Sequence, residues 1–214
     1  MATIEKIELL ENALSRFRQA PMEESGEEKI LAYRDAEMRL ADFMPNELNL
    51  TSLYLLEDHI ESLKRLRAEF LDRYQIDILR LSSVLHIKTD DGLLVGMAPP
   101  FVEIYEETVR IVSRPGDRRP PATVLLQIPV LIDGIHRAWI AREEGLSLRC
   151  IVVSGALKAY PPYAYPNDWS QVRVYSTKPE TKKFYRREDA HSYMAPLTVL
   201  RQTGDAPPPR EWGR

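Results

Sequence analysis

The sequence has little of several features that assign a function at once. It contains one cysteine, Cys150, in 214 residues, so no disulfide forms within the chain and no zinc site is built on paired cysteines. Cys150 lies in the apolar run 148–153, which predicts a buried strand and a thiol without catalytic use. The net charge is -3 at pH 7, so the molecule as a whole has no positive field that attracts nucleic acid or anionic lipid.

Long apolar runs are also missing. No stretch approaches the roughly 18 residues needed to span a bilayer. The N-terminus has no basic segment followed by the apolar run that is typical of a signal peptide. We therefore expect a cytoplasmic protein without membrane contact.

Four common catalytic or cofactor motifs do not occur in the sequence. It has no Gly-x-x-x-x-Gly-Lys-Ser/Thr loop, no Gly-x-Gly-x-x-Gly, no His-Glu-x-x-His and no Gly-x-Ser-x-Gly. Their absence disfavours P-loop hydrolysis, dinucleotide redox chemistry, zinc proteolysis and serine hydrolysis.

The first 75 residues have apolar residues at helical spacing. In the first segment these are Ile4, Ile7, Leu10, Leu14 and Phe17. A second helix is predicted from 27 to 43, and a third from 53 to 74 with Thr51 or Ser52 as N-cap. We expect a three-helix region, 1–75, that packs on the rest of the chain or docks a second copy or a protein partner.

From residue 76 the sequence pattern changes to short apolar runs separated by turn residues. Strands are predicted at 78–87, 101–105, 108–112, 124–132, 148–153 and 171–176. A turn is expected at 89–92, and a polar loop at 113–121 that closes over a ligand. The expected fold class is α+β.

The most informative segment is a strand, a tight turn and a helix start. The strand ends at Ile132, Asp133-Gly134 is a turn signal, and a helix follows to Glu144, with Gly145 as its cap. A helix N-terminus binds anions, yet His136 and Arg137 stand in the first turn, where cations cost roughly 0.3 to 1 kcal/mol each. A phosphate bound at this turn would make the two cations favourable. The alternative is structural: His136 is a half-buried histidine, Arg137 pairs with Glu143 or Asp133, and Asp133-Gly134 is an ordinary tight turn.

This segment resembles a known family. The string 131–137, followed by Ala138, Ala141 and Glu144-Gly145, is similar to the nucleotide-binding motif of the ParB/sulfiredoxin superfamily, and 99–104 resembles the approach to its first central strand. The resemblance covers about 76–155. It implies a small mixed-sheet ParB/sulfiredoxin-like domain, 76–203, after the helical region, with a tail at 204–214.

The resemblance also implies roles for individual residues. Gly134, Ile135, His136 and Arg137 would hold nucleotide phosphates, and Asp133 would act as a base or bind Mg²⁺, with His136 as a second catalytic residue. ATP or ADP is the expected cofactor, with CTP as a further option. Ile135 stands where sulfiredoxins need a cysteine, which disfavours sulfinic-acid reduction. Residues 156–214 lack a helix-turn-helix pattern, which disfavours chromosome or plasmid partitioning.

The segment 158–187 combines aromatic residues with a local excess of basic ones. Such a mixture suits nucleic acid, because bases stack on rings and phosphates pair with cations. The candidate contacts are Tyr160, Tyr163, Trp169, Lys182, Lys183 and Arg186. The alternative is that the rings cover a sheet edge and the charges form a solvated surface.

These observations lead to one expected function and two alternatives. We expect a nucleotide-binding protein that uses ATP or ADP for phosphoryl transfer or nucleotide hydrolysis. The first alternative is a non-catalytic nucleotide- or nucleic-acid-binding subunit of a larger assembly. The second is a ParB-like DNA nuclease.

Overall fold

The computed structural model describes residues 2–20, 31–111, 122–157 and 169–179. This part of the chain is mixed α/β, with strands in the majority. In chain order its elements are β1 (Thr3–Leu9), α1 (Leu10–Arg18), β2 (Glu37–Phe43), η1 (Pro45–Glu47), β3 (Asn49–Leu50), β4 (Tyr54–Leu56), α2 (Glu57–Tyr74), β5 (Ser83–Lys88), β6 (Leu94–Met97), β7 (Phe101–Ile111), β8 (Ala122–Asp133), α3 (Ile135–Glu143), β9 (Leu148–Ser154), η2 (Trp169–Gln171) and β10 (Arg173–Tyr175).

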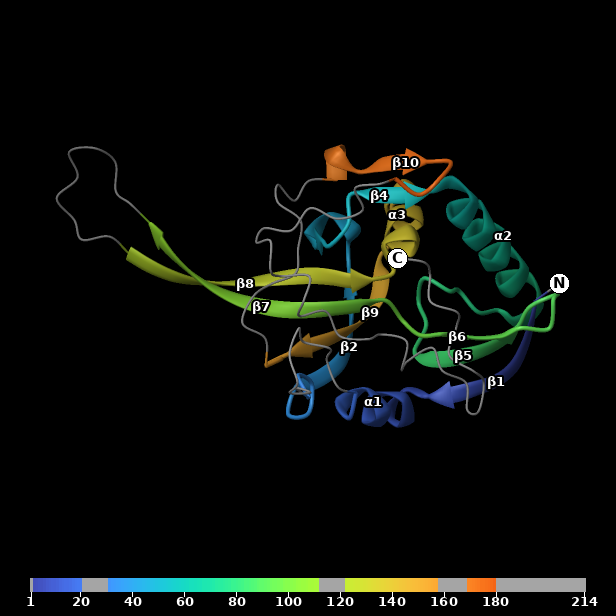
Figure 1. Cartoon of the computed structure of the whole chain (residues 1–214), viewed down its shortest axis with the longest axis horizontal. Helices are drawn as coiled ribbons and strands as arrows, with labels where there is room; N and C mark the ends of the chain where they lie inside the picture. The colour runs from blue at the N-terminus through green and yellow to red at the C-terminus, as the bar shows by residue number, and fades with distance from the viewer. Residues whose placement is uncertain (1, 21–30, 112–121, 158–168, 180–214) are drawn as a thin grey trace.

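The largest sheet has five strands in the order β2-β9-β7-β8-β3. β7 and β8 are antiparallel along their whole length, from the pair Phe101 and Asp133 to the pair Ile111 and Ala122. β9 lies parallel to β7, and β2 lies antiparallel to β9. Figure 1 shows β7 and β8 continuing beyond the sheet as a two-stranded arm.

Both faces of the five-stranded sheet are buried at its centre. Alternate residues of β7 point to opposite faces: Phe101 packs with α1 in one apolar cluster, and Val102 packs with α3 in another. Cys150 of β9 is fully buried in the second cluster, where burial raises the pKa of its thiol to about 12. The expectation of an unreactive strand cysteine agrees with this position.

A three-stranded sheet, β1-β5-β6, lies beside the first sheet under α2. Phe70 of α2 packs on Leu85 and Ile87 of β5. A short parallel pair, β10 and β4, completes the strand arrangement of the described residues. Within these residues every helix is too short or too polar to cross a membrane.

The expected three-helix N-terminal region is wrong. Residues 3–9 form β1, which pairs with β5, so only the short α1 remains of the first helix. In β1 the buried residue is Glu8, bonded to Arg16 and His86, while Leu9 is 70% exposed. The apolar spacing therefore did not mark the buried face, because a paired carboxylate occupies it.

The second predicted helix, 27–43, is also wrong where the structure describes it. Its end is β2, which pairs with β9 over residues 37–43. The third helix is confirmed as α2, but it begins at Glu57 with Leu56 as its N-cap. Thr51, expected as the cap, instead donates from its hydroxyl to the Leu131 carbonyl across the sheet. In all three predicted helices, the difference from the structure comes from contacts with residues distant in the sequence.

The predicted elements after residue 76 are closer to the structure. The strands expected at 101–105 and 108–112 are a single strand, β7, and those at 124–132 and 148–153 lie within β8 and β9. The expected strand 78–87 begins only at Ser83, since Arg80 donates to Asp77 in a turn. Helix α3 ends before Gly145, whose φ is +66°, as a glycine just past a helix end requires.

Candidate functional site

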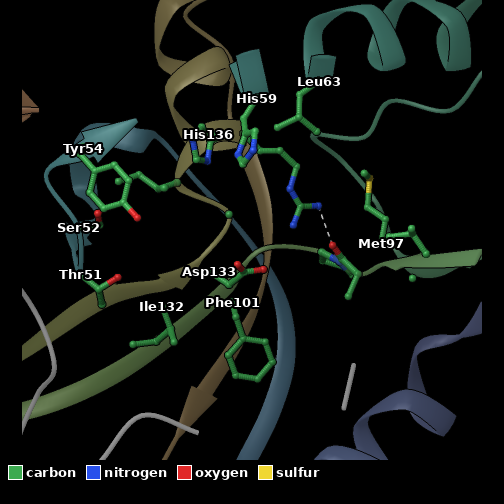
Figure 2. Close-up of a pocket in the computed structure, with 17 residues that line it drawn as sticks. Thr51, Ser52, Tyr54, His59, Leu63, Met97, Phe101, Ile132, Asp133 and His136 are labelled. Atoms are coloured by element: carbon green, nitrogen blue, oxygen red, sulfur yellow. Dashed lines mark hydrogen bonds between the residues drawn. The ribbon is translucent and has the colours of Figure 1, made fainter. Parts of the chain in front are cut away.

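A pocket of about 460 Å³ opens where three parts of the chain meet. Its walls come from the segment leading into α2 and the first turns of that helix, from β6 and the residues after it, and from the junction of β8 and α3. Figure 2 shows His59 and His136 side by side, with Asp133 below them and Leu63 and Met97 to one side. The volume lies in the range of small-molecule sites, about 300 to 1,000 Å³.

The predicted strand-turn-helix forms one wall of this pocket. Gly134 has a φ of +95° and serves as N-cap of α3, and its carbonyl accepts from the Ala138 N–H at 2.9 Å. A Cβ on Gly134 would lie 2.7 Å from Cβ of Pro100, so both the backbone angle and the space require glycine. The first turn of α3, whose N–H groups have no acceptors within the helix, begins at the pocket wall.

His136 is held in one tautomer by Leu56, the last residue of β4. Its Nε2 accepts a hydrogen bond from the Leu56 N–H at 3.0 Å, so the ring proton lies on Nδ1. Burial, together with the His59 ring 5.2 Å away, lowers the pKa of His136 to about 4. His136 is therefore neutral at pH 7, and Arg137 is the cation of this turn.

Arg137 reaches from α3 to the residues that follow β6. Its guanidinium donates to the Ala98 carbonyl at 2.6 Å, the contact drawn as a dashed line in Figure 2. The side chain is buried yet lines the pocket. Glu143, one alternative partner in the sequence interpretation, instead pairs with Lys64 at 3.1 Å. Arg137 thus joins two walls and brings a positive charge to the cavity.

Asp133 is the last residue of β8 and the acidic residue among those that line the pocket. In the described chain, no group of three or more His, Cys, Asp or Glu side chains could hold a metal ion. Magnesium usually keeps several waters and binds through one or two carboxylates plus ligand phosphates. Asp133 fits a site of that kind, in which the ligand supplies further oxygens.

The sequence interpretation missed several pocket residues as site residues, and His59 and Tyr54 are two of them. Both lie in the helix predicted from 53 to 74, where neither belongs to a motif. The structure places His59 against His136, and it places Tyr54 in β4 at the pocket, where burial raises its pKa. The packing of α2 against α3 brings the rings of His59 and His136 together, and no local spacing in the sequence indicates this contact.

Trp169, expected as a surface for base stacking, is a packing residue. It is 8% exposed, and its indole N–H donates to the Pro45 carbonyl at 2.9 Å. Its ring lies 6.1 Å from that of Trp139, and the Arg142 guanidinium lies over both rings. The remaining candidate nucleic-acid contacts, Tyr160, Tyr163, Lys182, Lys183 and Arg186, lie outside the described residues.

Comparison with known proteins identifies the family of this chain. A family model of the ParB CE domain matches residues 12–173. The chain therefore belongs to the ParB CE domain family, and a ParB-like domain suggests a role connected with nucleotides or nucleic acids. No curated protein and no solved structure matches the chain.

Proposed function

We propose that this ParB-like chain binds a nucleotide in the pocket, with its phosphates at the first turn of α3, and cleaves or transfers a phosphoryl group. One observation carries the proposal: the N-terminal end of α3, with its glycine turn, forms a wall of a ligand-sized cavity. Backbone N–H groups and the helix dipole at such an end favour phosphate.

The neighbouring side chains complement a phosphate in two ways. Arg137 supplies positive charge at the same wall. His136 keeps its proton on Nδ1, because Leu56 occupies Nε2, so the ring acts as a neutral hydrogen-bond donor. Together with the N–H groups at Gly134 and Ile135, these side chains make the proposed phosphate site.

Asp133 is the proposed catalytic carboxylate. From the pocket wall it orients a water or an acceptor hydroxyl, or binds Mg²⁺ together with phosphate oxygens. His136 cannot serve as a base through Nε2, since that lone pair already accepts from Leu56. Its catalytic contribution in the proposal is donation to the phosphoryl group in the transition state. ATP or ADP is the proposed nucleotide, with CTP as the further option.

The test is to incubate the full chain with ATP, ADP or CTP and Mg²⁺, measuring affinity by calorimetry and products by mass spectrometry. Asp133→Asn should lower turnover by about 100-fold or more and leave affinity within a few-fold. Asp58→Asn is the matched control, because Asp58 lies near His136 but does not line the pocket. If none of the three nucleotides binds, the proposed site is refuted.

A second function, nucleotide binding without turnover, is favoured by a different observation. Among the described lining residues, Asp133 is the only carboxylate, and the His136 lone pair is engaged. Binding of a nucleotide without product, in both the unmodified chain and Asp133→Asn, would establish this function in place of catalysis.

The other expectations have less support. The three-helix region expected to dock a partner does not form, since residues 3–9 are β1 and residues 37–43 are β2. Binding of a second copy or a protein partner stays a prediction. Nuclease activity depended on the basic aromatic segment, most of which lies outside the described residues. It stays a prediction, tested by a salt-sensitive gel shift with single-stranded DNA. The cytoplasmic location likewise stays a prediction.

A further inference from the structure

The second wall of the pocket contains the outer edge of strand β6. Within the described residues, β6 pairs on one side only, with β5. In the hairpin that joins them, the Thr89 N–H donates to the Leu93 carbonyl at 2.9 Å. Because bonded and non-bonded pairs alternate in an antiparallel ladder, Val95 and Met97 exchange bonds with β5. The N–H and C=O of Gly96, between them, therefore point away from β5.

The pocket lining shows which way this outer edge faces. Just past the end of β6, the Ala98 carbonyl accepts from Arg137 at the pocket. Gly96 itself is buried and lines the pocket. Gly96 stands opposite His86 of β5 in a pair that exchanges no hydrogen bond, and no other element of the described chain donates to Gly96 or accepts from it. Buried backbone groups are almost always paired, so this edge is suited to a ligand.

We infer that the backbone of Gly96 recognises the base of the bound nucleotide. The Gly96 N–H donates to a ring nitrogen, and its C=O accepts from the neighbouring exocyclic amine. Adenine and cytosine both present this pair of groups on their Watson–Crick edges. This inference rests on the proposed function and narrows the ligand to a complete nucleotide, as opposed to a bare polyphosphate.

The surroundings of Gly96 suit a flat aromatic ring. The absence of a side chain allows a ring to approach the backbone closely. Leu63 and Met97, which also line the pocket, lie to one side of the two histidines (Figure 2) and offer apolar surface. Along the strand, Gly96 and Ala98 are about 6.6 Å apart, and Arg137 binds at Ala98. The backbone proposed for the base and the cation proposed for the phosphates therefore lie at neighbouring positions of one pocket.

Proline at position 96 removes the proposed donor without removing a ladder bond, because proline is tolerated at a sheet edge where its nitrogen faces outward. Gly96→Pro should weaken binding of ATP about 10- to 100-fold by calorimetry. Binding of inorganic tripolyphosphate should change less than about three-fold, since it has no base. Leu94→Pro is the control, because its nitrogen also faces outward but Leu94 does not line the pocket.

A second measurement uses the unmodified chain. Purine riboside triphosphate lacks the amine of ATP and should bind about ten-fold more weakly. Equal affinity for the two nucleotides, or equal losses of ATP and tripolyphosphate binding in Gly96→Pro, would overturn the inference. If the unmodified chain binds tripolyphosphate but prefers no nucleotide over it, the inference also fails. If it binds neither, the proposed function itself fails.

Discussion

Replacing Gly134 with alanine should destabilise the fold more than the same change at the other turn glycines that the structure describes, Gly92, Gly145 and Gly155. Alanine at a positive φ costs about 1 to 2 kcal/mol. Its Cβ would lie 2.7 Å from Cβ and 3.3 Å from Cα of Pro100, and overpacking of this kind costs about 1 to 3 kcal/mol. The sum, about 2 to 5 kcal/mol, is a large part of a typical folding free energy.

Gly145 provides the matched control for this change. Its φ is +66°, but a Cβ there would meet nothing within 4 Å, so Gly145→Ala carries the backbone cost alone. Thermal unfolding followed by circular dichroism should show a loss of about 4 to 20 °C for Gly134→Ala and a clearly smaller one for Gly145→Ala. Equal losses would show that the contact with Pro100 does not constrain the turn.

Three further predictions concern buried polar groups. The pKa of His136 is about 4 in the folded chain against 6.5 ordinarily, so the unfolded chain takes up an extra proton as the pH falls from 6.5 to 4. The free energy of unfolding should therefore fall over this range by roughly 1 to 3 kcal/mol relative to His136→Gln. Parallel pH profiles of the two proteins in chemical denaturation would contradict this. Tyr33→Phe removes a hydroxyl that donates to the buried Glu103 carboxylate, which should cost about 1.5 to 3 kcal/mol in urea unfolding. Trp169→Phe deletes the hydrogen bond to the Pro45 carbonyl and should lower the free energy of unfolding by about 1 to 2 kcal/mol. An unchanged midpoint of urea unfolding would show that the indole N–H does not make this bond.

The strand-turn-helix could be predicted because its signals are local. Asp133-Gly134 marks a turn, the helix length follows from the residues up to Gly145, and the positive φ at both glycines agrees with this interpretation. The resemblance to ParB-like proteins depended on the same short string, and the family match extends it over residues 12–173.

The N-terminal strands could not be predicted in this way. Strand β2 exists because β9 provides its hydrogen-bonding partner more than one hundred residues later, as in the pair Ala41 and Cys150. Strand β1 buries Glu8, whose pKa is held at about 2, chiefly by its hydrogen bond to Arg16. An apolar pattern cannot show a face that is buried through an ion pair.

The sequence predicted which residues of the strand-turn-helix would form the candidate site, but not the charge state and hydrogen bonds of their side chains. Both His136 and Arg137 line the pocket, yet the sequence interpretation treated them as two cations. Their states depend on a backbone N–H from Leu56 and a carbonyl from Ala98. Neither partner lies close to the motif in sequence.

The order of the five-stranded sheet has a consequence for any shortened form of this chain. Its two outer strands, β2 and β3, both precede residue 76, while β9, β7 and β8 between them all follow it. A chain that begins at residue 76 would therefore expose the backbone edges of both β9 and β8. Unpaired edges of this kind recruit strands from other molecules, so such a fragment should self-associate even where the 214-residue chain does not.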